Sequence, residues 1–254
     1  MSLDFERPPI NEVVLGVFFS PVASLRAEAV GLFWARIRDT FPSVVQQPVY
    51  TQQVSIIPPP RQPGELFPLP RFWFLSRDQT RLIQFQNGAL LYNWRRQEGD
   101  YPRFSRIFVE FLEHLENFQK FLVDDLQIDA PKFTLAELTY INLFGTLESL
   151  AVPTDYKHVV ETFCEHSELE KDLTLDNFHH VDFFRAANGD QFIVTQRSLR
   201  QPLENRISVV LELKVTGPLI TPLNDWFSAA HNRINENFLR LTSPEMQKTV
   251  WRRK

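Results

Sequence analysis

Residues 82–104, LIQFQNGALLYNWRRQEGDYPRF, constrain the fold more than any other stretch of this chain. Apolar residues alternate there with Gln84 and Gln86, and this period of two predicts a strand with one buried face and one wet face. Asn87-Gly88 favours the positive φ angles of a type I′ turn, so the stretch predicts a β-hairpin. The second strand ends in polar and aromatic side chains that offer more hydrogen bonds than folding needs, which marks a candidate site.

Hydrophobic periodicity predicts further strands and helices on both sides of this hairpin. Helices are expected where apolar residues recur every three or four positions, with Ser20-Pro21 and Thr221-Pro222 as start signals. The expected strands are 12–19, 72–75, 82–86, 89–94, 132–144, 178–186, 191–196 and 207–213. The expected helices are 22–39, 102–125, 156–165 and 223–241.

This order predicts an α+β fold, with mostly antiparallel sheet built from two hairpin-strand-helix halves and long helices packed on one face. The halves are expected at 1–150 and 151–254, packed as one compact unit. The face that carries the glutamines is expected to stay open as a concave surface. Residues 42–70 hold 8 of the 18 prolines and predict a semi-extended loop that could contain one strand near 54–57.

Composition and short motifs exclude several classes of protein. The net charge of −4 predicts no overall attraction to nucleic acid or to an anionic membrane. Cys164 is the single cysteine, which excludes an intrachain disulfide and a cysteine-rich zinc site. The sequence has neither a glycine-rich phosphate loop nor an HExxH motif, so no cofactor and no metal is predicted. With no secretory signal and no run near the roughly 18 apolar residues of a membrane span, a cytoplasmic location is expected.

The end of the hairpin and the turn after it hold the first candidate binding site. Planar cations beside aromatic rings predict a pocket for a nucleobase, a phosphate or a carboxylate. In the alternative interpretation, Trp94 anchors the strand end and the arginines form surface ion pairs with Glu98 and Asp100. The candidate residues are Asn93, Trp94, Arg95, Arg96, Tyr101 and Arg103.

A second candidate lies in ELTYIN, within the strand expected at 132–144. Strand alternation places Glu137 on one face and Tyr140 with Asn142 on the other. A buried Glu137 could pair with Arg95 or Arg96 from the hairpin. Such a pair is structural more often than catalytic.

His231 and Asn235 stand four positions apart near the start of the last helix and share one of its faces. The histidine could act as a general base, or it could bond a nearby backbone group. No nucleophile motif such as G-x-S-x-G accompanies it. The histidine and acidic residues of the helix expected at 156–165 lack the convergent third and fourth ligands of a metal site and predict a solvated face.

Several segments together resemble a sporadically distributed family of uncharacterised bacterial proteins of about this length. They are RPPINEVVLGVFF (7–19), LIQFQNGALLYNWRR (82–96), YPRF (101–104), ELTYINLF (137–144) and HNRINENFLRLTSPEMQKTVW (231–251). Because these segments spread over nearly the whole chain, the resemblance concerns the whole protein. Such patchy families often travel by lateral transfer, so the resemblance implies a defence, toxin-neutralising or mobile-element role. It implies no catalytic residues.

Three functional hypotheses follow from these observations. The first is a non-enzymatic protein that binds another protein through the open sheet face or the proline-rich loop, in an antitoxin, immunity or defence-accessory role. The second is a protein that senses or processes a nucleotide or nucleic acid with the Trp94–Arg103 segment and Glu137. The third is a small-molecule hydrolase that uses His231. The absence of a catalytic motif favours the first, and the partner and the oligomeric state stay open.

Overall fold

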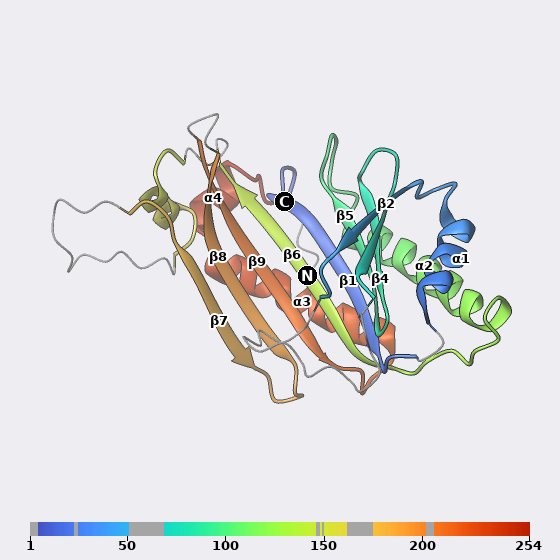
Figure 1. Ribbon diagram of the computed structural model, residues 1–254. Helices are drawn as coiled ribbons and strands as arrows, with labels where there is room; N and C mark the ends of the chain where they lie inside the picture. Colours follow the sequence, from blue (N-terminus) through green and yellow to red (C-terminus); the bar gives the residue numbers. More distant parts are fainter. Residues whose placement is uncertain are drawn as a thin grey trace. The chain divides into compact units, whose positions relative to one another are not determined.

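The chain has an α+β fold, in which the residues that the structure describes form an antiparallel sheet of nine strands and three long helices (Figure 1). The computed structural model describes residues 5–22, 25–50, 69–145, 148, 150–161, 175–201 and 206–254. The strands are β1 (Ile10–Phe19), β2 (Ser43–Gln47), β3 (Arg71–Leu75), β4 (Arg81–Gln86), β5 (Ala89–Arg95), β6 (Phe133–Phe144), β7 (His179–Arg185), β8 (Gln191–Gln201) and β9 (Arg206–Pro218). The helices are α1 (Ala27–Ile37), α2 (Phe104–Asp124), α3 (Leu223–Leu241), α4 (Pro244–Thr249) and the 3₁₀ helix η2 (Pro153–His158).

Hydrogen-bonded strands follow the order β2-β3-β4-β5-β1-β6-β9-β8-β7. The chain divides into two compact units: unit 1 comprises residues 1–14, 98–102 and 137–254, and unit 2 comprises residues 15–97 and 103–136. Since the boundaries fall within β1 and β6, both strands supply residues to each unit. The predicted division into halves at residue 150 stays a prediction.

Phenylalanine side chains form the core of unit 2. Phe33 of α1 and Phe118 of α2 have ring centroids 5.6 Å apart, and Phe118 lies at the same distance from Phe85 of β4. Phe33 also meets Phe121 at 5.2 Å. All four rings are buried, and such pairs add about 0.5–1.5 kcal/mol each beyond the burial of their area. The abundance of phenylalanine in the sequence therefore serves to join two helices to β4.

In unit 1, α3 packs against β9 (Figure 1). Its buried side chains recur three or four positions apart, as the amphipathic pattern predicts. Trp251 lies beyond α4, and its ring stacks 5.5 Å from that of Phe144 in β6. The Nε1 of this buried tryptophan donates a hydrogen bond to Glu148 Oε1 at 3.0 Å, which fixes the C-terminal residues to the sheet.

Three element boundaries differ from the sequence prediction. The expected helix 22–39 is α1, which begins at Ala27 after the N-cap residue Arg26, so Ser20 is not its cap. The loop expected at 42–70 contains β2, whose pairing with β3 overrides its proline-rich surroundings; the strand expected at 54–57 lies outside the described residues. The helix expected at 156–165 is represented by η2, and residues 162–165 also lie outside the described residues.

The β4–β5 turn is not type I′, because Gly88 has a φ of +101° but Asn87 has no positive φ. A type I′ turn requires positive φ at both central residues. The Asn87 side chain instead holds the backbone of Val22, where Oδ1 accepts from Val22 N at 2.8 Å and Nδ2 donates to Val22 O at 2.9 Å. The hairpin itself is confirmed, with Gln86 opposite Ala89.

Candidate functional site

Three of the predicted site residues come together in unit 1. The hydroxyl oxygens of Tyr101 and Tyr140 lie 3.1 Å apart, and the Tyr140 hydroxyl lies 2.9 Å from His231 Nδ1. On the other side of the imidazole, Asn235 Nδ2 lies 3.0 Å from His231 Nε2. If the Asn235 amide donates to Nε2, the neutral ring carries its proton on Nδ1 and donates it to Tyr140. This Tyr101–Asn235 relay joins β6 to α3, and the bond between His231 and a backbone group that the sequence suggests stays a prediction.

Burial decides the protonation state of the relay. Desolvation lowers the pKa of His231 to about 4 and raises the pKa of Tyr140 well above its usual value. Both groups are therefore neutral at pH 7. A neutral imidazole that is bonded on both sides holds its neighbours in place, and this arrangement fits a structural role better than general-base catalysis.

The sheet face of unit 2 that carries Gln84 and Gln86 is buried, whereas the sequence predicted that it is exposed to solvent. Gln84 and Asn93 are 5% and 2% exposed, and Gln84 Nε2 donates to Asn93 Oδ1 at 2.8 Å. Gln84 Oε1 accepts from Arg71 Nη1 at 2.8 Å and from Trp73 Nε1 at 3.1 Å. Gln86 is bonded through its side chain to the backbone of Tyr50. The alternation correctly predicts a strand, but a buried polar side chain is stable once its hydrogen bonds are satisfied.

A second polar cluster, which no sequence motif indicates, joins α2 to the β4–β5 hairpin. Glu110 accepts from Arg81 Nε at 2.6 Å, from Arg81 Nη2 at 3.1 Å and from the Tyr92 hydroxyl at 2.7 Å. Burial alone would raise the pKa of Glu110, but the hydrogen bonds from Arg81 and Tyr92 lower it overall. Arg81 and Glu110 stand 29 residues apart, so no local sequence signal connects them. The cluster therefore holds α2 to the β4–β5 hairpin.

The remaining predicted site residues take separate places. In unit 2, Trp94 is 4% exposed, and the Arg96 guanidinium lies 5.8 Å from its ring centroid. Arg103 precedes α2 with φ +76° and ψ 148°, a conformation that L side chains rarely adopt.

In unit 1, Glu137 lies 3.6 Å from Lys214 Nζ, and Asn142 Nδ2 donates to Leu211 O at 3.1 Å. Because Arg95 and Arg96 belong to the other unit, their pairing with Glu137 stays a prediction.

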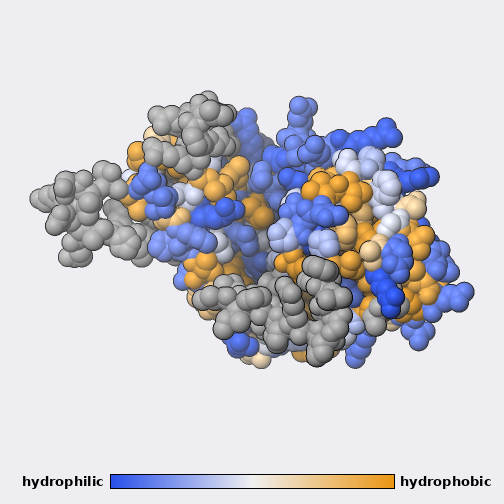
Figure 2. All heavy atoms as spheres, in the orientation of Figure 1, coloured by the Kyte–Doolittle hydropathy of each residue, from blue (hydrophilic) through white to orange (hydrophobic). Residues whose placement is uncertain are grey.

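β7 is one end of the strand order, and no further strand follows it among the described residues. All seven of its residues are exposed, including Val181, Phe183 and Phe184 with 39%, 51% and 54% of their surface accessible. Figure 2 shows hydrophobic atoms at the position of β7 among hydrophilic ones. An exposed apolar edge strand is unusual, because it is a template for pairing with another chain.

Hydrogen bonds at the two ends of the β7–β8 hairpin show which backbone groups face the open edge. Ser198 N donates to Phe178 O at 3.0 Å, and Ala186 N donates to Asp190 O at 2.8 Å. In an antiparallel pair, hydrogen-bonded positions alternate with positions whose N–H and C=O groups point away. The even-numbered residues of β7 therefore bond β8, and the odd-numbered residues present their backbone groups to the open edge. These are His179, Val181, Phe183 and Arg185.

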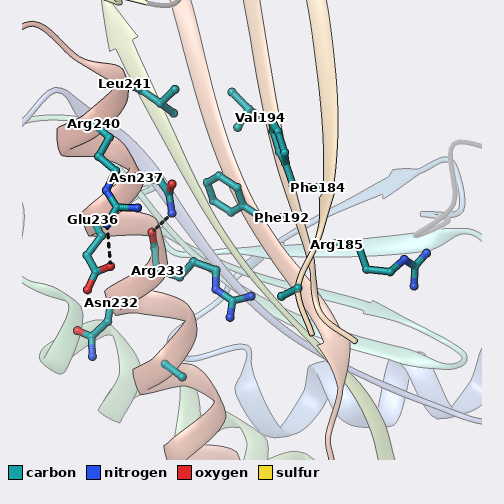
Figure 3. A pocket seen from close by; sticks show the side chains of 12 residues that line it. Phe184, Arg185, Phe192, Val194, Asn232, Arg233, Glu236, Asn237, Arg240 and Leu241 are labelled. Atoms are coloured by element: carbon teal, nitrogen blue, oxygen red, sulfur yellow. Dashed lines mark hydrogen bonds and ion pairs between the residues drawn. The ribbon is translucent and has the colours of Figure 1, made fainter. Parts of the chain in front are cut away.

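A groove of about 530 Å³ lies between α3 and the β7–β8 pair (Figure 3). We call it the β7 groove. Figure 3 shows Arg233 extending from α3 toward the strands and Arg240 beside Glu236, whereas Arg185 points away from α3. Its apolar lining is Phe184, Ala186, Phe192, Val194, Ala229 and Leu241, and its polar lining is Arg185, Asn232, Arg233, Glu236, Asn237 and Arg240.

The sequence carries one signal for this surface. Phe183 and Phe184 are adjacent, so a strand at this position must place one phenylalanine on each of its faces. Such a strand either lies inside the protein with both faces covered or presents an aromatic ring to solvent. The turn residues predict the hairpin, but they do not predict its place at the end of the strand order.

Other kinds of site find less support. Within the described part of the chain, no group of three or more histidine, cysteine, aspartate or glutamate side chains is arranged to hold a metal ion. None of the helices in that part has the length and apolar character needed to cross a membrane. Comparison with protein-family models, with curated proteins and with solved structures finds no match for this chain.

Proposed function

We propose that this chain is a non-enzymatic binding protein and that its partner is another protein, which adds a β-strand to the open edge of β7. The observation that carries the proposal is the exposure of all seven β7 residues, three of which are large and apolar. Edge strands of folded proteins are usually protected by lysine, proline, a bulge or a covering segment. β7, HHVDFFR, contains neither lysine nor proline.

Strand addition suits this edge because the main chain supplies affinity and the side chains supply selectivity. The outward backbone groups of Val181 and Phe183 would bond the added strand. Their side chains lie on the face opposite Phe184, so the partner would cover apolar surface on both sides of β7. The proposed docking surface is the edge of β7 and not the concave glutamine face expected from the sequence, because that face is buried.

The proposed role is that of an accessory protein of defence, antitoxin or immunity type, which is supported by the resemblance to a sporadically distributed bacterial family. Long helices packed on a single face of the whole sheet are part of the same proposal.

A nucleotide or nucleic-acid function at Trp94–Arg103 is the alternative. The strained conformation of Arg103 favours it, because strain of this kind often marks functional sites. The burial of Trp94 opposes it, because a base stacks only on a ring face that it can reach. Salt-sensitive binding of a single-stranded oligonucleotide that is lost on Arg103→Ala would favour this alternative.

The proposed function is tested by crosslinking in the native host. A photoreactive phenylalanine analogue is placed at Phe183 and, as a control, at Val109, which is exposed to a similar extent on α2. We expect a defined crosslinked protein from position 183 only. Val181→Pro should abolish this crosslink, because it removes an outward N–H group without disturbing the β8 ladder. Equal crosslinking from both positions, or crosslinking unaffected by the proline, would overturn the proposal.

A further inference from the structure

We infer that, when no other protein is bound, the β7 edge pairs with β7 of a second copy of this chain, antiparallel and about a two-fold axis at Val181. This inference goes beyond the proposed function, because it uses the same edge but not the identity of the partner. The occupant follows from the sequence of β7 itself, HHVDFFR, which is complementary to its own reverse in one register. The free protein is then a dimer, and binding of another protein competes with it.

The backbone of β7 limits how two copies can pair. Its odd-numbered residues present their N–H and C=O groups to the open edge, as the hydrogen bonds at both ends of the β7–β8 hairpin show. Two β7 strands therefore exchange hydrogen bonds only where odd-numbered residues stand opposite odd-numbered residues. In a two-fold dimer every contact is reciprocal, so one residue stands directly opposite its own copy. For most of β7 to be paired, that residue must be Val181, Asp182 or Phe183.

Electrostatics favours Val181 among these three. An axis at Val181 places Asp182 of each copy opposite His180 of the other, where a ring N–H can donate to the carboxylate. An axis at Asp182 would place its two copies opposite each other, and like charges in that position destabilise a sheet. An axis at Phe183 would place Asp182 opposite the ring of Phe184, which removes water from the carboxylate and offers no strong donor. Only the first register gives Asp182 a partner.

His180 and Asp182 are both accessible in the single chain. They belong to a strand whose seven residues are all exposed, and Asp182 has no ion-pair partner among the described residues. The His180 ring contacts that of Phe178, with 5.8 Å between the ring centroids, which leaves its edge able to donate. Because they stand two positions apart, both side chains lie on one face of β7. The two-fold axis repeats the contact, so the dimer contains this pair twice.

The same register covers exposed apolar side chains on the opposite face of β7. Val181 meets its own copy at the axis, and Phe183 of each copy lies diagonal to Val181 of the other, within reach of an aromatic side chain. In the single chain these two side chains are 39% and 51% exposed. The dimer removes both from water and satisfies outward backbone groups of an edge that carries neither lysine nor proline.

The small size of the interface makes the dimer weak. Residues 179–183 of each copy are directly paired, which is five of the seven residues of β7. A standard interface has roughly 20–30 residues on each side. A dimer of this size dissociates on dilution, and a partner that extends along the whole of β7 displaces it by mass action. The second copy therefore protects the edge without closing it permanently.

Disulfide trapping locates the axis. Val181→Cys, Asp182→Cys and Phe183→Cys are each made in a Cys164→Ser background, because Cys164 is the single native cysteine. The purified full-length proteins are oxidised with copper phenanthroline, and the disulfide-linked dimer is measured on a non-reducing gel. Only the residue at the axis faces its own copy, with Cα atoms about 5.5 Å apart, a separation that a disulfide bridges.

We expect Val181→Cys to form the dimer at least about 10-fold faster than the other two variants, whose cysteines lie beyond the span of a disulfide. The two copies of Asp182 are diagonal neighbours, about 7–8 Å apart. The two copies of Phe183 are offset by four positions along the strands, about 13 Å. Val109→Cys on α2, where the native side chain is 53% exposed, controls for random collision and should crosslink slowly.

An exchange of two residues tests the register without a cysteine. His180→Asp places carboxylates opposite each other and should raise the monomer–dimer midpoint in light scattering about 5-fold in concentration. Adding Asp182→His to the same chain exchanges the two residues and should restore the wild-type midpoint. Lys120→Glu, on the exposed face of α2, alters the net charge elsewhere and should leave the midpoint unchanged.

The outcomes separate this inference from the proposed function. A protein that stays monomeric, a disulfide that forms fastest at Asp182→Cys or Phe183→Cys, or a double variant that fails to restore the dimer would overturn the inference. Each of these results leaves strand addition by another protein intact. A dimer with its axis at Val181, together with a crosslink from Phe183 in the host that captures only a second copy, would support the inference and overturn the proposed function.

Discussion

The two hairpins of this protein have similar turn residues, but the strands of one are buried and the first strand of the other is exposed. β4–β5 turns at Asn87-Gly88, and β7–β8 turns around Asn188-Gly189. The strands of the first hairpin are buried along almost their whole length, whereas β7 is exposed at every residue. Turn chemistry therefore predicts that two strands pair, and it says nothing about what will cover them.

Neighbouring elements account for the difference. β4 lies between β3 and β5 in the strand order, and Phe118 of α2 packs on Phe85. β7 has a strand on one side only within the described residues, and α3 leaves the β7 groove beside it. An aromatic side chain thus stabilises the first hairpin from inside, while Phe183 and Phe184 of the second hairpin remain exposed.

The largest effect is expected from truncating matched phenylalanines in the two hairpins. Phe85→Ala should lower the free energy of unfolding by about 3–5 kcal/mol, because it removes a buried ring and leaves a cavity. Phe184→Ala should change it by no more than about 0.5 kcal/mol, since its ring is largely exposed. Urea denaturation measures both, and equal losses would show that the contrast between the hairpins is wrong.

A smaller effect is expected at the Glu110 cluster of unit 2. Glu110→Gln should cost about 1–3 kcal/mol of unfolding free energy, because Arg81 and Tyr92 lose a charged acceptor. Glu116→Gln, on the exposed face of the same helix, is the control and should leave the urea midpoint unchanged.

The pH dependence of this cluster has a defined sign. Since the pKa of Glu110 is lowered in the folded state, its contribution is complete above the unfolded value of 4.5 and is lost as pH falls through the folded pKa. Glu110→Gln should therefore lose less stability than the wild type on acidification in this range. An identical acid response of the two proteins would contradict the assignment.

Two buried histidines, one in each unit, are expected to make the stability of the folded protein depend on pH. Burial lowers the pKa of His114 and of His231 from 6.5 to about 4. Between these values the unfolded chain binds a proton that the folded chain does not, so stability falls as pH decreases from 6.5 to 4. Each histidine should contribute a slope of up to about 1.4 kcal/mol per pH unit.

Urea midpoints between pH 7 and pH 4.5 measure this slope. His114→Gln and His231→Gln should each reduce it, because glutamine does not titrate. A slope that neither substitution changes would show that folding does not lower the pKa of either ring.

The smallest effect on stability is expected at the edge strand. Val181→Lys should change the unfolding free energy by no more than about 0.5 kcal/mol, yet it should reduce association at high concentration because an edge lysine blocks strand pairing. Light scattering measures the association, and Val109→Lys on α2 is the control. Association that responds equally to both variants would remove β7 as its cause.

The sequence alone determined the elements whose signals are local. The predicted strands 82–86 and 89–94 lie within one residue of β4 and β5, and the predicted helix 102–125 corresponds to α2. It also identified Tyr101, Tyr140 and His231 as candidates, but assigned them to three separate sites. Periodicity and turn chemistry act over a few residues, which is the range that a single sequence reports.

Only the tertiary structure decided burial and the partners of polar groups. Gln84 alternates like a solvent-facing residue, but its hydrogen bonds to Asn93 and Arg71 make burial stable. Glu110 meets Arg81 across 29 positions of sequence, and β7 became an open edge because of its place in the strand order. Each outcome depends on which distant segments pack together, and the free energy of that packing is a property of the whole fold.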